Sequence, residues 1–390
     1  MSSKTDRMDY LGSITIGAIL IALLMTGCAS APPKSEGEIP KGPSEVELYL
    51  SFAQDYLNKR IYPDAIGNFR KVLELDSLNF AAYSGLAAAY IGKGDPDSAF
   101  YSYQRAVAAA PDDPRGYAGL GYVATEKESY GDAVVSYKQA LRIDPEMPEA
   151  VFGVGYAYLQ LQQFDSAATY LEHAVQLDPA NLSIKYSLGE VYTELEEYDK
   201  AIAELQPVVN EHAEDIRARI LLGEAYFEKG EYRSAIDEFK AVLEYFPEYC
   251  SGVIKIGKCY EQLGDFERAS EYYEQSIEVD PENPVCYEHL AVAYIEMGRY
   301  AKARQLAERA RELDPDDTLP SVLLGDVHKN LGDLYAGRRE HLEAIDEYEK
   351  AIREYMKAQQ CPMYGQYVRT EIKRLNIRIE RERLLEMEEF

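Results

Sequence analysis

Residues 148–181 read PEAVFGVGYAYLQLQQFDSAATYLEHAVQLDPAN, and residues 250–283 read CSGVIKIGKCYEQLGDFERASEYYEQSIEVDPEN. Both stretches are 34 residues long, and they agree in their small residues, their aromatic residues and their closing Asp-Pro pair. An alanine recurs at the same place in eight such stretches: Ala65, Ala99, Ala133, Ala167, Ala201, Ala235, Ala269 and Ala303. A fixed period of this length predicts a solenoid of helical hairpins.

Numbering each repeat so that this alanine stands at position 20 places eight repeats over 46–317 without an insertion. Position 8 is glycine in the middle repeats, and position 11 is tyrosine in all repeats but one. Small residues at positions 8 and 20 allow two helices to approach closely, and we expect the tyrosine at position 11 to fill the space beside them. An Asp-Pro pair at the end of four repeats predicts the stop of the second helix.

The pattern resembles the tetratricopeptide repeat over about 46–356, although tyrosine or another residue replaces the usual tryptophan at position 4. The resemblance implies an all-α fold, a right-handed superhelix (α-solenoid) with a C-terminal capping helix. A ninth unit at 318–356 fits after a shift of seven residues, two helical turns, so we expect its first helix to be longer. This unit is expected to cap the array or to serve as a docking site. Residues 357–390 carry the apolar stripe Val368, Ile372, Leu375 and Ile379, which predicts a capping helix or a dimerisation helix.

The first 27 residues have the features of a secretory signal. The apolar run Leu11–Met25 is shorter than the ~20 residues that span a bilayer. Its end, Met25-Thr26-Gly27-Cys28, resembles a bacterial lipobox, which implies acylation of Cys28 and removal of residues 1–27. An uncleaved signal anchor and a non-targeting start are the alternatives. Residues 28–45 are rich in proline and are predicted to be a flexible tether.

The lipobox resemblance implies a lipoprotein of the bacterial envelope that faces the periplasm. Ala29 resembles the sorting pattern of outer-membrane lipoproteins, so the outer membrane is the expected site. The lipid bilayer is then one partner, reached through acylated Cys28.

Composition and motifs limit the chemistry of the chain. A net charge of −27 argues against nucleic acid as a partner. The sequence has no HExxH, Walker, GxGxxG or GxSxG motif, and its five histidines fall in different repeats, so we expect no catalytic residues, metal or cofactor. Cys250 and Cys259 are separated by ~13 Å along one helix and cannot bond. Cys259 and Cys286, on neighbouring first helices, are the only pairing to test. Reduced thiols buried in the helices are the expected state, although the periplasm would allow oxidation.

In the resembled family the first helices line a concave face, where positions 5 and 9 of some members hold a peptide carboxylate with Lys and Asn. That clamp is absent. Aromatic residues stand at these positions in repeats three to five, next to small residues, and acidic residues follow them on the first helices of repeats five and six. The candidate partner-binding residues are Tyr122, Phe152, Tyr156, Tyr186, Glu190, Glu194, Glu224 and Glu228. Packing of the aromatics against one another is the alternative interpretation.

These observations predict a lipid-anchored scaffold, not an enzyme, that binds a protein or peptide with an apolar or aromatic anchor and basic residues. The resemblance implies a role in assembling an envelope machine, such as a pilus secretin or the outer membrane, or in recruiting a periplasmic hydrolase. The rival prediction is a structural accessory subunit of a fixed membrane complex that uses its convex face or its ninth unit and has no peptide groove.

Overall fold

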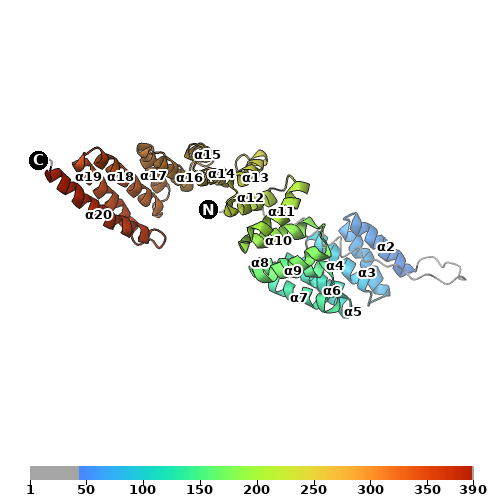
Figure 1. Cartoon of the computed structure of the whole chain (residues 1–390). Helices are drawn as coiled ribbons and strands as arrows, with labels where there is room; N and C mark the ends of the chain where they lie inside the picture. Colours follow the sequence, from blue (N-terminus) through green and yellow to red (C-terminus); the bar gives the residue numbers. More distant parts are fainter. Residues whose placement is uncertain (1–43, 389–390) are drawn as a thin grey trace. The chain divides into compact units, whose positions relative to one another are not determined.

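The structure, a computed structural model, describes residues 44–388, and every regular element in that range is an α-helix (Figure 1). The predicted signal, Cys28 and nearly all of the tether lie outside the described residues. Within 44–388, no helix combines the length and the apolar character needed to cross a membrane. The described residues divide into two compact units, 44–211 and 212–388.

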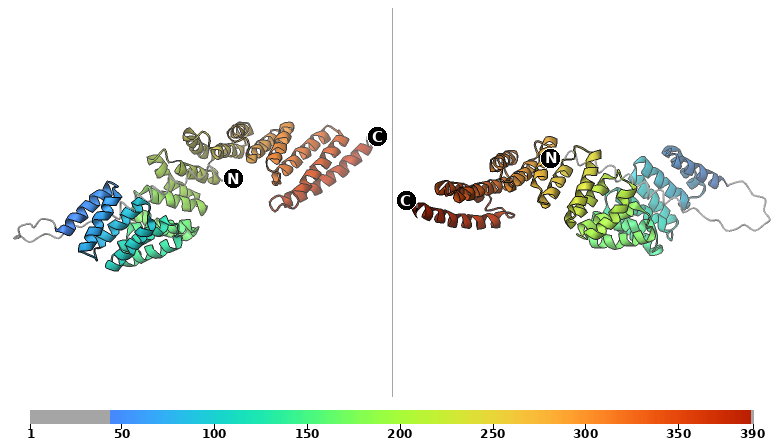
Figure 2. Two further views of the ribbon diagram at one scale, coloured as in Figure 1. Left: turned by 180° about the vertical axis from the view of Figure 1, so that it is seen from behind. Right: turned by 45° about the horizontal axis from the view of Figure 1, so that its top comes forward.

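The N-terminal unit contains five helical hairpins in its described part, and Figure 2 shows their helices stacked in chain order. The helices are α2 (Glu45–Asn58), α3 (Tyr62–Leu75), α4 (Phe80–Lys93), α5 (Pro96–Ala109), α6 (Pro114–Glu126), α7 (Tyr130–Ile143), α8 (Pro148–Gln160), α9 (Phe164–Leu177), α10 (Leu182–Glu194) and α11 (Tyr198–Glu211).

The C-terminal unit continues with three hairpins of the same length, then a longer hairpin and a single last helix. The helices are α12 (Ile216–Lys229), α13 (Tyr232–Tyr245), α14 (Cys250–Gln262), α15 (Phe266–Val279), α16 (Pro284–Glu296), α17 (Tyr300–Leu313), α18 (Leu319–Gly337), α19 (His341–Lys357) and α20 (Gly365–Glu388).

The 34-residue frame is confirmed at every hairpin of the array. In six repeats an Asn or Asp at position 34 accepts a hydrogen bond from the first turn of the next helix, for example Asn79 from the Ala82 amide at 2.9 Å. The residue at position 15 turns the chain with positive φ in all eight repeats: Arg60, Gly94, Glu128, Gln162, Glu196, Gly230, Gly264 and Gly298. In the four repeats that end with an Asp-Pro pair, the second helix stops directly before the aspartate, as α7 does at Ile143.

The space beside the glycine at position 8 is filled by the residue at position 24, not by the tyrosine at position 11. A Cβ added to Gly121 would lie 2.7 Å from the Tyr137 ring, and one added to Gly257 would lie 2.4 Å from the Tyr273 ring. The expectation for position 11 was therefore wrong. The large side chain comes from the facing helix of the same hairpin, where it points directly at the glycine.

The tyrosine at position 11 instead connects neighbouring repeats through its hydroxyl group. At four junctions its partner is the residue at position 25 of the preceding repeat, which differs in charge from junction to junction. The bonds are Arg70 to Tyr90 at 2.7 Å, Lys138 to Tyr158 at 2.6 Å, Tyr192 to Glu172 at 2.7 Å and Tyr294 to Glu274 at 2.5 Å. We call these the junction bonds.

The ninth unit has the lengthened first helix that the sequence predicts. Helix α18 has 19 residues, against 13 or 14 in the repeats before it. Its two Leu-Gly-Asp segments make the same contact twice with α19. Gly325 lies under the Tyr355 ring and Asp326 accepts from the Tyr355 hydroxyl at 2.7 Å. Gly332 and Asp333 hold Tyr348 in the same way, at 2.6 Å.

Helix α20 packs on α19 and ends the array. Three residues of the predicted stripe, Val368, Leu375 and Ile379, are buried in a cluster with Tyr348 and Tyr355 of α19. The predicted capping helix is confirmed, with the helix itself spanning Gly365–Glu388.

Candidate partner-binding surface

The predicted aromatic residues of the N-terminal unit lie on three consecutive first helices, α6, α8 and α10, and each of these helices contacts the next. Tyr122 comes from α6, Phe152 and Tyr156 from α8, and Tyr186 from α10. The structure therefore places all four on one series of neighbouring helices, as the repeat frame predicts.

Two of these aromatics belong to the core and present almost no surface. Tyr122 is 2% exposed and Phe152 is 7% exposed. Burial raises the pKa of Tyr122, with a further contribution from the adjacent Glu126 carboxylate. The open space expected beside them is absent, because the Tyr103 and Tyr137 rings fill the positions next to Gly119 and Gly153. The prediction that Tyr122 and Phe152 are available to a partner is corrected accordingly.

The other two aromatics remain partly exposed and are followed by carboxylates. Tyr156 packs its ring 6.2 Å from that of Phe152, at an interplanar angle of 42°. Tyr186 and Glu190 are partly exposed on α10, and Glu194 is exposed at the end of the same helix. We call Tyr156, Tyr186, Glu190 and Glu194 the aromatic–acidic wall.

The remaining predicted carboxylates, Glu224 and Glu228, lie on α12 in the C-terminal unit. Glu224 is not an isolated acid, because Lys255 of α14 pairs with it at 2.6 Å and both side chains are about one-third exposed (32%). Sequence reasoning missed Lys255 because it stands at position 6, outside the positions expected to face inward. The first helices of this unit therefore carry mixed charge.

Two consecutive residues of α16 have shifted pKa values: Glu288, which is buried, and His289, which is partly buried. Glu288 is 5% exposed. Burial raises its pKa to about 7, assisted by the hydrogen bond that the protonated Glu288 carboxyl donates to Asp317 and by the negative charge of Asp317. Burial, assisted by the positive charge of Lys258, lowers the pKa of His289 to about 4, and its ring stacks on Tyr273 at 5.2 Å. Across residues 44–388 no three His, Cys, Asp or Glu side chains are placed to hold a metal ion.

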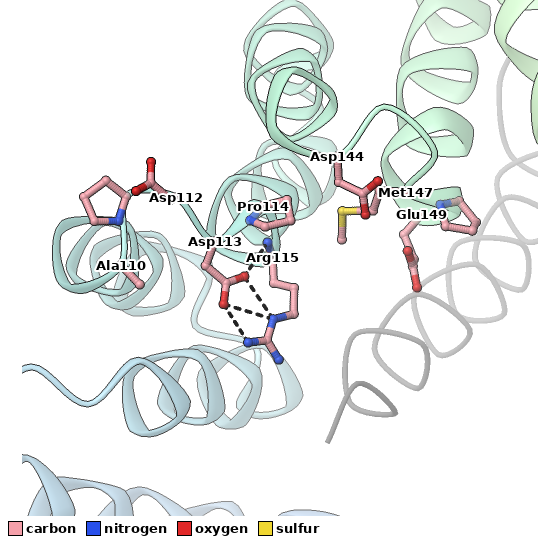
Figure 3. Close-up of a pocket in the computed structure, with 10 residues that line it drawn as sticks. Ala110, Asp112, Asp113, Pro114, Arg115, Asp144, Met147 and Glu149 are labelled. Carbon is pink, nitrogen blue, oxygen red and sulfur yellow. Dashed lines mark hydrogen bonds and ion pairs between the residues drawn. The ribbon is translucent and has the colours of Figure 1, made fainter. Parts of the chain in front are cut away.

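A hollow of about 660 Å³ lies at the turns that lead into α6 and α8 (Figure 3). Its lining is Ala110–Arg115, Asp144 and Met147–Glu149. Asp113 holds Arg115 through a hydrogen bond and an ion pair of 2.6 Å, and the guanidinium lies over the Phe80 ring at 4.9 Å. The hollow is formed by two successive repeat turns, at the starts of α6 and α8.

Family comparisons agree with this geometry over most of the array. Family models described as tetratricopeptide repeat match residues 50–114, 162–225, 198–254 and 260–321, and one described as TPR repeat matches 121–162. The chain is a tetratricopeptide repeat protein. No curated protein matches it.

Solved structures similar to this tetratricopeptide repeat protein include YrrB, which is described as a TPR protein with an unusual peptide-binding site. The two chains are 24% identical with a TM-score of 0.44, and the match covers 46% of this chain and 92% of that chain. PilF of Pseudomonas aeruginosa is 20% identical, with a TM-score of 0.48 and 52% and 92% covered. MamA is 24% identical, with a TM-score of 0.42 and 44% and 94% covered. These similarities concern the repeat fold alone.

Proposed function

We propose that this protein is a lipid-anchored scaffold that binds a protein or peptide partner on the aromatic–acidic wall. The observation that carries the proposal is the arrangement of Tyr156 and Tyr186 on adjacent first helices, partly exposed, with Glu190 and Glu194 following on α10. A half-buried aromatic ring is already held in place, so it contributes contact area at a small entropic cost. The flanking carboxylates match a partner with basic residues near an apolar or aromatic anchor.

Helix α8 supplies a matched pair of tyrosines for the test. Tyr156 belongs to the aromatic–acidic wall, whereas Tyr158, two residues later, makes the junction bond with Lys138. Peptides are first selected from a displayed random library with the chain purified from its membrane. We expect them to carry an aromatic or apolar anchor beside Lys or Arg.

Tyr156→Ala is expected to weaken binding of the selected peptides by ~2 kcal/mol, which raises Kd by a factor of roughly 30, with little change in melting temperature. Tyr158→Ala is expected to lower the melting temperature and to leave the affinity of the folded protein unchanged. Calorimetric titration beside thermal unfolding separates the two results. If Tyr156→Ala lowered stability and left affinity intact, Tyr156 would be a core residue and the proposed site would be wrong.

The carboxylates are tested by their effect on association. Glu194→Lys should slow binding of a basic peptide and reduce the salt dependence of the association rate, with a smaller effect on dissociation. Glu228→Lys, on α12, tests the separate prediction that Glu224 and Glu228 also take part. An unchanged association rate in both variants would limit the site to the aromatic residues.

The membrane anchor rests on Cys28 and the apolar run before it, which support a lipoprotein that faces the periplasm, and Ala29 supports the outer membrane as its site. Two or more acyl chains give stable anchoring at ~0.8 kcal/mol for each buried CH₂ group. Labelled fatty acid should enter the wild-type protein and not Cys28→Ala, which should accumulate as the precursor. Absence of label in the wild type would remove the anchor from the proposal.

One observation favours the rival function, an accessory subunit that docks through its ninth unit. The last two helices expose large apolar side chains: Leu342, Met356, Ile377, Leu384 and Met387. If Leu342→Asp, in the ninth unit, abolished recovery of membrane partners and Tyr156→Ala did not, an accessory subunit that docks through its ninth unit would replace the proposed binding at the aromatic–acidic wall.

A further inference from the structure

Two of the four described cysteines lie together in the C-terminal unit. The Sγ atoms of Cys250 and Cys286 are 3.6 Å apart. The sequence analysis singled out Cys259 with Cys286 as the pairing to test, whereas the structure places Cys250 beside Cys286. Cys250 and Cys259 are both on α14, and Cys250, the first residue of that helix, is the one that lies next to Cys286.

The repeat frame explains why these residues meet. Cys250 stands at position 1 of repeat seven and Cys286 at position 3 of repeat eight, so both lie in the first turns of consecutive first helices. Helix α15 packs against both α14 and α16. Its Ser276 carbonyl oxygen lies 3.6 Å from the Cys250 sulfur, which keeps that side chain directed toward the junction.

The two thiols differ in access and in acidity. Cys286 is fully buried, whereas Cys250 is partly exposed at the start of its helix. A hydrogen bond from the Cys250 thiol lowers the pKa of Cys286 to about 7, against the opposing effect of burial. The same hydrogen bond, together with burial, raises the pKa of Cys250. The Cys286 thiolate is therefore the base that can take the Cys250 proton, and a thiolate is the form that attacks a disulfide.

The gap between the sulfurs is small enough to close by side-chain movement. A disulfide bond is about 2.05 Å long, so the sulfurs need to approach by only ~1.5 Å. Cys250 is the first residue of α14, where rotation of its side chain is not blocked by a preceding turn of the helix.

We propose that Cys250 and Cys286 form a disulfide bond by exchange with an external protein or small-molecule disulfide. As the Cys250 sulfur attacks one sulfur of the donor, its proton passes to the Cys286 thiolate, the donor S–S bond breaks, and the first donor sulfur leaves as a thiolate. That thiolate takes the proton from Cys286. The Cys286 thiolate then attacks the Cys250 sulfur of the mixed disulfide, and the second donor sulfur leaves as a thiolate. One protein thiol and one protein thiolate are oxidised to a disulfide, and one donor disulfide is reduced to a thiol and a thiolate, so the protons and electrons balance.

The bond would join α14 to α16 and enclose α15 in a covalent loop. A cross-link of this kind reduces the conformational entropy of the unfolded chain more than that of the folded chain, so the oxidised protein should resist unfolding of the C-terminal unit. The inference stands apart from the proposed partner, because the wall residues lie in the N-terminal unit.

The test uses the full chain in a glutathione buffer, with oxidised glutathione as the donor. After oxidation, alkylation of the remaining thiols and proteolysis without reduction, mass spectrometry should find one peptide pair that contains Cys250 and Cys286. The same pair is expected in Cys259→Ser and Cys361→Ser. In Cys250→Ser no pair forms, and in Cys286→Ser the glutathione adduct should remain on Cys250, because the resolving thiol is missing.

Thermal unfolding gives the second measurement. Oxidation should raise the melting temperature of the wild type by several degrees, reduction with dithiothreitol should reverse the rise, and Cys250→Ser should show neither change. Three results would overturn the proposal: a pair that contains Cys259, a stable glutathione adduct on Cys250 of the wild type, or a Cys250–Cys286 bond that lowers the melting temperature.

Discussion

At the scale of single residues, position 15 of each repeat shows how one backbone conformation is met by different side chains. Four repeats place glycine there and four place Arg, Glu or Gln, all with positive φ. Left-handed backbone costs a non-glycine residue about 1–2 kcal/mol, whereas glycine adopts it freely. The turn is therefore imposed by the packing of the hairpin and not by the residue that occupies it.

This difference predicts opposite effects for two glycine substitutions. Gly264→Ala, at φ +75°, should lower the free energy of unfolding by ~1 kcal/mol. Gly131→Ala should raise it by up to ~1 kcal/mol, because Gly131 is helical and a Cβ there meets nothing within 4 Å. Urea denaturation of both variants checks the prediction, and equal signs would contradict it.

Glu288 predicts a pH dependence of stability. Its folded pKa of about 7 lies above the model-peptide value of 4.5, so the folded protein holds more protons than the unfolded chain between these pH values. The contribution of Glu288 to stability is therefore greatest below pH 4.5 and is lost as the pH rises through 7, with a penalty of up to about 3 kcal/mol above that pH.

Glu288→Gln cannot ionise, so its free energy of unfolding should exceed that of the wild type by an amount that grows from pH 5 to pH 8. Comparing the two proteins removes the opposite pH dependence of His289, whose lowered pKa is present in both. Glu278→Gln, exposed on α15, is the control and should show a flat difference. A flat difference for Glu288→Gln would mean that this carboxyl is ionised in the folded protein.

At the scale of elements, the two Leu-Gly-Asp segments of α18 show what lengthens a terminal hairpin. Each glycine admits a tyrosine ring from α19 and each aspartate accepts the hydroxyl of that tyrosine. Repeating the segment after two helical turns keeps both contacts on the same face of the helix.

Gly332→Ala would bring a Cβ to 2.5 Å from the Tyr348 ring, and this overpacking should cost ~1–3 kcal/mol. Gly337→Ala on the same helix is the control, since a Cβ there meets nothing within 4 Å. Limited proteolysis should then release fragments that end near α18 in the first variant alone. Equal resistance of the two variants would show that α18 and α19 can separate without cost.

The frame of elements was predictable from the sequence, and the partners of its side chains were not. Period, helix stops and the longer α18 follow from residues that repeat or break at fixed intervals. Which ring fills the space beside a glycine depends on the direction of the facing helix, so Tyr137 and not a position 11 tyrosine lies beside Gly121. The same limit applies to Tyr122 and Phe152, whose burial depends on how closely neighbouring repeats pack.

At the scale of the whole molecule, contacts between successive helices dominate each unit. Stability of such an array is close to a sum of nearest-neighbour terms. Ala167 is fully buried between α8 and α9, and Ala167→Leu should cost ~1–3 kcal/mol by forcing these helices apart. Protease should first cut the variant within repeats three to five, with the rest resisting longer. Cleavage that is uniform along the chain would contradict a repeat array.

The junction bonds have a consequence for how such a chain changes over generations. A tyrosine hydroxyl donates to a carboxylate and accepts from a cation with equal ease. Position 25 therefore stays bonded whether it is Arg70, Lys138, Glu172 or Glu274. Mutations that reverse charge at this position are tolerated by the contact between repeats. Over evolution, charge substitutions at position 25 can therefore change the surface potential of the protein, and with it the choice of binding partners, while the contacts between repeats are kept.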